Sequence, residues 1–189
     1  MEIFWNTIAR YNAATWPWQI AIVAAAAVLT VLLYLRPTQN VKRAMKLFLA
    51  GLNAWIAVVY YLVWCGQRSH SDVLALFWGI MAVIWLYDLY ADFTRFERTS
   101  RPNGFALLLY LMPLAYPLFS LARGLSFPMM TMPVMPCSVA VFTIGLMLAF
   151  THRINIFLVL FLCHWALIGL AKVYFFGIPE DFLLAASTV

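Results

Sequence analysis

Six long apolar runs divide the chain, and most of its charged residues fall in the short gaps between these runs. A bilayer has a hydrocarbon core about 30 Å thick, which about 20 helical residues can cross. A segment inside hydrocarbon must also satisfy its own backbone hydrogen bonds, and a helix does so. The pattern therefore predicts an all-α membrane protein with transmembrane helices at residues 18–35, 47–64, 73–90, 105–121, 137–150 and 154–171.

The composition agrees with this interpretation. Hydrophobic residues make up 66% of the chain and charged residues 10%, whereas soluble domains carry roughly 25% charged residues. Six crossings leave no room for a separate soluble domain, so residues 1–189 are expected to form one membrane-embedded domain. In a membrane protein, a net charge of +5 reports orientation and contact with anionic head groups. The bilayer is therefore the expected partner, and nucleic acid is not.

Three segments lie outside the predicted spans. Residues 1–16 are expected to form a helix in the head-group layer, because Phe4, Ile8 and Tyr11 share one helical face. The apolar segment 122–136 contains three prolines and is expected to fold back onto the bundle as an outer, re-entrant segment. Residues 179–189 are expected to begin a truncated or re-entrant seventh helix, with a tail on the membrane surface as the alternative.

Basic residues are distributed unequally between the two sides of the predicted bundle. The connections after spans one, three and five hold eight lysines and arginines, and the opposite side holds four. Because cytoplasmic connections are enriched in basic residues, the bias places the N-terminus outside. The eight residues are Arg36, Lys42, Arg43, Lys46, Arg95, Arg98, Arg101 and Arg153.

Two features inside the spans are candidates for a transport path. Pro113 and Pro117 lie one turn apart in the fourth span, and each proline removes a backbone donor from the helix. Broken helices coordinate ions in transporters, although a structural kink is the alternative. His164 lies midway along the sixth span, where an ionisable group usually faces a partner or a cavity. A neutral histidine bound to a neighbouring helix is its alternative.

Other polar residues lie nearer to the ends of the spans. Asn53 lies inside the second span and Asp88 near the cytoplasmic end of the third. Asp88, Asp92 and Arg95 share a helical face, which favours a ladder of surface ion pairs.

Three further charged residues cluster near the end of the chain. Lys172 closes the sixth span and can extend its side chain to the outer interface. Glu180 and Asp181 are candidate partners for it there.

Sulfur-bearing residues gather near the fifth span. Met129, Met132, Met135 and Cys137 offer the soft ligands that Cu(I) prefers, although methionine also fills irregular apolar gaps. Cys65 and Cys137 fall on the same outer face, where a disulfide is permitted. Because no motif of known catalytic chemistry is present, no enzymatic activity, cofactor or resident metal is expected.

Several stretches are similar to those of a known family, at residues 1–5, 11–18, 77–85, 116–124, 163–167 and 178–181. They resemble a bacterial family of small multi-pass membrane proteins catalogued as a domain of unknown function. The resemblance covers nearly the whole chain and implies a protein of the bacterial cytoplasmic membrane. It implies no substrate, cofactor or catalytic residue.

The leading functional hypothesis is transport of a small solute or ion, along a path lined by the fourth span, His164 and segment 122–136. The alternative is a membrane scaffold or partner-binding subunit without a path, assembled with further copies of itself or with another membrane protein. A membrane oxidoreductase that uses Cys65 and Cys137 is a third hypothesis.

Overall fold

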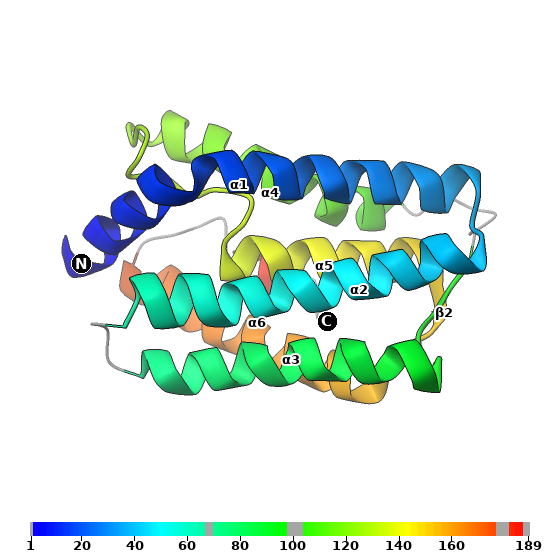
Figure 1. The fold of residues 1–189 in the computed structure, drawn as a ribbon. Helices are drawn as coiled ribbons and strands as arrows, with labels where there is room; N and C mark the ends of the chain where they lie inside the picture. Colours follow the sequence, from blue (N-terminus) through cyan, green and yellow to red (C-terminus); the bar gives the residue numbers. More distant parts are fainter. Residues whose placement is uncertain (1, 67–69, 98–103, 177–181, 187–189) are drawn as a thin grey trace.

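The helices lie side by side along a common direction (Figure 1) in the computed structural model, which describes residues 2–66, 70–97, 104–176 and 182–186. They are joined at one end by a short antiparallel ribbon of β1 and β2. In chain order the elements are α1 (Glu2–Leu35), α2 (Gln39–Trp55), the π-helix η1 (Ile56–Trp64), α3 (Ser71–Ala91), β1 (Arg95–Phe96), α4 (Gly104–Ala122), α5 (Pro136–Phe150), β2 (Thr151–Arg153), α6 (Ile156–Phe176) and α7 (Phe182–Ala186).

Among the described residues, four helices are long and apolar enough to cross a membrane, namely Ile3–Leu35, Gln39–Trp64, Ser71–Ala91 and Gly104–Ala122. The prediction of an all-helical fold is confirmed. The predicted fifth span, α5, is a shorter apolar helix of 15 residues. The count of six spans and a partial seventh therefore stays a prediction.

The first helix differs from the sequence-based expectation, because the predicted interfacial helix and the first span form one helix of 34 residues. Pro17, which directly precedes the predicted span at residues 18–35, lies inside this helix. At 1.5 Å per residue the helix is about 50 Å long, which exceeds the thickness of a hydrocarbon core, about 30 Å. Phe4, Ile8 and Tyr11 are buried, and Tyr11 hydrogen-bonds to Val134 of the outer segment. This face therefore contacts the protein itself.

Helix α5 lies at the centre of the bundle, with α1 and α4 on one side and α2, α3 and α6 on the other (Figure 1). All of its residues from Pro136 to Met147 are buried, as expected for a helix that is apolar all round. A Cβ atom at Gly145 would lie 2.5 Å from the backbone nitrogen of Tyr110 in α4. The absence of a side chain there lets the backbones of α4 and α5 touch.

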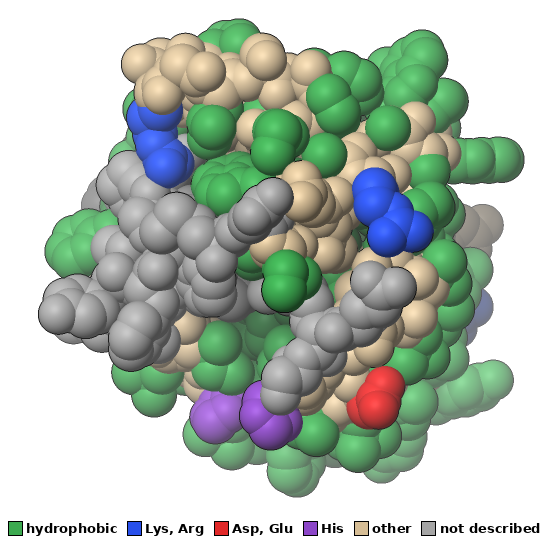
Figure 2. Space-filling view, turned by 90° about the vertical axis from the view of Figure 1, so that its left-hand side faces the viewer, with side chains coloured by type: hydrophobic (Ala, Val, Ile, Leu, Met, Phe, Trp, Pro, Cys, Tyr) green, Lys and Arg blue, Asp and Glu red, His purple; other side chains and the backbone are tan. Residues whose placement is uncertain are grey.

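The two ends of the bundle differ in charge. The ends of α1 and α3, the start of α2 and the β1–β2 ribbon gather at one end (Figure 1). The described basic residues of the predicted cytoplasmic side belong to this end, namely Arg36, Lys42, Arg43, Lys46, Arg95 and Arg153. The opposite end, near the start of α1, presents hydrophobic and uncharged groups with scattered charged and histidine side chains (Figure 2).

Candidate functional site

A buried ion pair joins α2 to α3 near the ribbon. The Lys46 Nζ atom lies 2.9 Å from Asp88 Oδ2 and 2.8 Å from Asp92 Oδ1. It also donates a hydrogen bond of 3.0 Å to the backbone oxygen of Asp88. Lys46 is 3% exposed and Asp88 is fully buried. All three donors of the ammonium group are therefore used, which a buried charge requires for stability.

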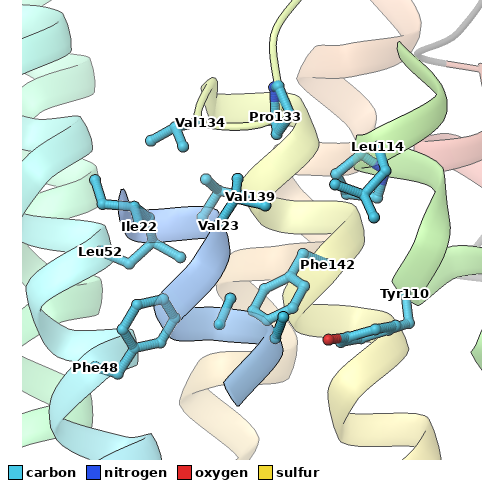
Figure 3. Close-up of a pocket in the computed structure, with 13 residues that line it drawn as sticks. Ile22, Val23, Phe48, Leu52, Tyr110, Leu114, Pro133, Val134, Val139 and Phe142 are labelled. Carbon is cyan, nitrogen blue, oxygen red and sulfur yellow. The ribbon is translucent and has the colours of Figure 1, made fainter. Parts of the chain in front are cut away.

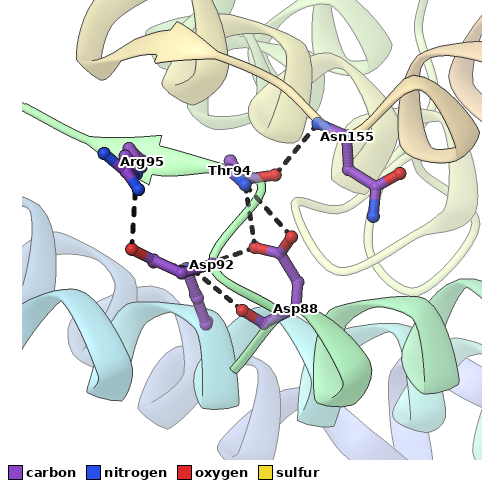
Figure 4. Close-up of polar contacts among 6 residues, drawn as sticks. Asp88, Asp92, Thr94, Arg95 and Asn155 are labelled. Atoms are coloured by element: carbon purple, nitrogen blue, oxygen red, sulfur yellow. Dashed lines mark hydrogen bonds and ion pairs between the residues drawn. The ribbon is translucent and has the colours of Figure 1, made fainter. Parts of the chain in front are cut away.

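The Asp88 carboxylate also holds the chain that leaves α3. The Thr94 backbone N–H donates to its Oδ1 and Oδ2 atoms at 3.1 and 3.2 Å (Figure 4). The Thr94 hydroxyl in turn accepts a 3.2 Å hydrogen bond from the backbone N–H of Asn155. We call Lys46, Asp88, Asp92 and Thr94 the ionic cluster. It ties α2, α3, the ribbon and the start of α6 into one unit.

The predicted ladder of surface ion pairs is wrong for Asp88. Asp92 and Arg95 do approach each other at the surface, with 3.5 Å between Arg95 Nε and Asp92 Oδ2. Asp88 instead points into the protein toward Lys46, which lies about two turns inside α2 and not in a connection. Asp92 lies just beyond the end of α3. Its pKa is lower than the ordinary value, mainly because its carboxylate accepts a hydrogen bond from Lys46.

At the other end of the bundle, α1 holds the outer segment by hydrogen bonds. The Asn12 amide donates to the backbone oxygens of Pro128 and Met130 at 2.9 and 2.8 Å. The Tyr11 hydroxyl donates to the backbone oxygen of Val134 at 2.7 Å and accepts a 3.1 Å bond from the Trp55 indole. These contacts fasten residues 128–134 to the bundle.

An apolar pocket of about 70 Å³ lies below this fastened segment (Figure 3). It is partly open to the surroundings, and Tyr110 is the one lining residue with a polar side chain. The lining residues come from α1, α2, α4, α5 and the outer segment, namely Ile22, Val23, Ala26, Ala27, Phe48, Leu52, Tyr110, Pro113, Leu114, Pro133, Val134, Val139 and Phe142.

The sequence explains why a pocket forms here. Pro113 removes a helical donor from α4, so the backbone oxygen of Leu109 loses its partner and the helix cannot pack regularly at this turn. On the facing helix, Ala26 and Ala27 leave space because their side chains are small. Leu114 is 50% exposed, and Ala27 is also exposed. The opening thus lies on the side of the bundle, halfway along α4 and halfway along residues 18–35, which form the second half of α1.

The structure brings together two of the three predicted parts of a transport path. Pro113 of the fourth span and Pro133 of the outer segment both line the pocket, whereas Pro117 does not. His164 is exposed on α6, and its ring lies 5.7 Å from that of Phe77. Asn53 is buried, and its amide donates to the Leu49 backbone oxygen within α2 at 2.7 Å.

The remaining candidates do not form a described site. Glu180 and Asp181 lie outside the described residues, as does the side chain of Lys172. Cys65 and Cys137 are both buried, and neither forms a disulfide in the structure. No group of three or more His, Cys, Asp or Glu side chains in the described ranges could hold a metal.

The sulfur-bearing candidates are spread between the surface and the core. Met129 is exposed, whereas Met135 and Cys137 are buried. The backbone N–H of Met132 donates to the Met135 sulfur at 3.4 Å. Binding of Cu(I) by these residues stays a prediction.

Sequence reasoning did not identify the polar face of α1. Tyr11, Asn12, Thr15 and Gln19 are all buried, and their spacing of three to four residues places them on one helical face. The Gln19 amide donates to Thr15 Oγ1 at 3.0 Å and approaches Asn12 Oδ1 at 3.3 Å. This spacing was the available signal, but the expectation of a separate interfacial helix ending at residue 16 concealed it.

The model of a family of unknown function, DUF6064, matches the chain over residues 1–189. Neither a curated protein sequence nor a solved structure matches it.

Proposed function

The chain belongs to the DUF6064 family, for which no activity is described. From the geometry of the structure we propose that the protein binds a lipophilic molecule that enters sideways from the bilayer. In this proposal the chain is a multi-pass protein of the bacterial cytoplasmic membrane with its N-terminus outside. The four apolar helices of membrane-spanning length among the described residues and the concentration of basic residues at one end support that placement.

The pocket is the observation that carries the proposal. Its lining is apolar apart from the Tyr110 phenol, and it is partly open. An opening between α1 and α4, halfway along α4 and halfway along the predicted span at residues 18–35 of α1, would face lipid acyl chains and not water. Ligand sites are typically concave and mostly apolar, with few polar groups. An acyl or prenyl chain therefore matches the pocket better than the small polar solute or ion expected from the sequence.

Photolabelling can test this proposal because α5 is buried in the bundle. The protein would be reconstituted with a phosphatidylcholine that carries a diazirine in one acyl chain, then irradiated and mapped by mass spectrometry. Lipid-facing positions such as Leu118, which is 64% exposed, are labelled in any case. Labelling of Val139 or Phe142 requires that a chain enters the pocket.

Two substitutions on α1 form a matched pair. Val23→Phe fills the pocket and is expected to reduce labelling of α5 several-fold, while Leu118 stays labelled. Val28→Phe makes the same change at a position that is 58% exposed and does not line the pocket, so it should leave α5 labelling unchanged. If wild-type α5 remains unlabelled while Leu118 is labelled, the proposal is wrong, and the scaffold alternative is favoured.

A further inference from the structure

Two arginines lie opposite each other in the ribbon at the basic end of the bundle. Arg95 of β1 and Arg153 of β2 are Cα partners in the antiparallel pair. The register shifts at the adjacent pair, Phe96 with Thr151, so an irregularity in the ribbon adjoins the two arginines. Directly opposite residues in an antiparallel pair have Cβ atoms about 4.5–5.5 Å apart. Both side chains are exposed. Like charges in this position repel and destabilise a ribbon, so their placement calls for a compensating anion.

The ribbon cannot relieve this repulsion by moving away from the bundle. Phe96, next to Arg95, is fully buried and stacks on Trp85, with 6.4 Å between ring centroids and 7° between ring planes. The backbone N–H of Glu97 donates to the Phe150 oxygen at 2.6 Å. The hydrogen bonds of Thr94 to Asp88 and Asn155 hold the preceding residue. The ribbon is therefore fixed with its two arginines pointing outward.

Nearby carboxylates compensate only part of the charge. Asp92 lies 3.5 Å from Arg95 but is shared with Lys46, which it meets at 2.8 Å. Glu97 is exposed beside the ribbon. Arg153 has no ion pair with any carboxylate in the described part of the chain. Its guanidinium group thus remains available to an external anion.

From this geometry we propose that Arg95 and Arg153 bind the phosphate of an anionic phospholipid head group, such as phosphatidylglycerol. The ribbon lies where α3 ends and α6 begins, which is the level of the head groups for helices that cross a bilayer. Guanidinium groups bind phosphate oxygens in pairs. Arg36 and Arg43, both exposed at the same end, would add to the attraction for a negatively charged lipid.

Native mass spectrometry of the purified full chain can test this proposal. The protein would be titrated with phosphatidylglycerol, and in parallel with phosphatidylcholine of the same acyl chains. Wild-type protein is expected to retain phosphatidylglycerol more strongly. Arg153→Gln should weaken phosphatidylglycerol binding about fivefold, since one basic residue near an anionic surface contributes about 1 kcal/mol. Arg153→Lys should restore part of the affinity.

The control is Arg123→Gln, which removes an exposed arginine that follows α4 and should leave the lipid preference unchanged. Equal retention of the two lipids by the wild-type protein would overturn the proposal. So would an Arg123→Gln effect as large as that of Arg153→Gln. Competition by millimolar inorganic phosphate as effective as that by phosphatidylglycerol would identify a free-anion site instead. Val23→Phe should not alter this preference, so the pocket and the ribbon are tested separately.

Discussion

Replacement of Lys46 by methionine is expected to destabilise the fold strongly. Methionine preserves much of the side-chain volume but removes the charge and the three hydrogen bonds that Nζ makes to Asp88 Oδ2, Asp88 O and Asp92 Oδ1. Asp92 is 46% exposed and can be solvated, whereas Asp88 is fully buried and would keep only Thr94 N–H as a described partner. Removing one member of a buried ion pair typically costs about 3–5 kcal/mol.

Asp88→Asn should cost less than Lys46→Met. In this variant Lys46 keeps the Asp92 carboxylate and the Asp88 backbone oxygen, and the new amide oxygen can still accept from Thr94. The double variant should be more stable than Lys46→Met alone, because it no longer buries an unpaired carboxylate. The two substitutions are therefore expected to be coupled, so that the double variant loses less stability than the sum of the two single losses.

Two buried cysteines provide the assay. Cys65 is fully buried and Cys137 is 8% exposed, and neither is in a disulfide, so a thiol-reactive fluorophore should react with them when the protein unfolds. Cys163, which is partly exposed, would be replaced by alanine in every variant to lower the background. Thermal midpoints in one detergent then rank the four proteins.

The expected order of stability is wild type, Asp88→Asn, the double variant and Lys46→Met, with the middle two allowed to exchange places. If Lys46→Met unfolds at the wild-type temperature, burial of the Asp88 carboxylate does not depend on this lysine, and the reasoning is refuted. If the double variant is less stable than Lys46→Met, the unpaired carboxylate is not the source of the loss.

The remaining predictions concern helix packing and pH. Gly145→Ala should destabilise the α4–α5 pair by about 1–3 kcal/mol, because the new Cβ would lie 2.5 Å from the Tyr110 nitrogen. The control is Gly79→Ala, whose new Cβ would have nothing within 4 Å, and it should be neutral or stabilising in the same thermal assay. The pKa of Asp92 is lower in the folded protein than in the unfolded chain. The contribution of Asp92 to the free energy of unfolding is therefore present above the unfolded pKa, about 3.9, and is lost as the pH falls through the folded pKa. Thermal unfolding followed by intrinsic fluorescence from pH 6 to pH 3 should thus show a smaller fall of the thermal midpoint for Asp92→Asn than for the wild type. Identical slopes of the thermal midpoint against pH would contradict the role of the Lys46 contact.

Hydropathy alone was sufficient to place the third and fourth spans along the chain. The predicted spans 73–90 and 105–121 lie within α3, Ser71–Ala91, and α4, Gly104–Ala122. The reason is that a long apolar segment can satisfy its backbone only as a helix when hydrocarbon surrounds it. The gathering of the basic residues at one end follows from the order of the spans, since every second span returns the chain to the same side.

The lateral arrangement of the helices came from tertiary packing. Nearly every face of these spans is apolar, and lipid does not drive apolar side chains inward as water does. Hydropathy therefore could not show that α5 is central, that Lys46 meets Asp88 across 42 positions, or that Pro113 and Pro133 border one pocket. These pairings depend on close backbone contact at Gly145, on buried hydrogen bonds and on one ion pair, and each of them joins residues that are distant in the chain.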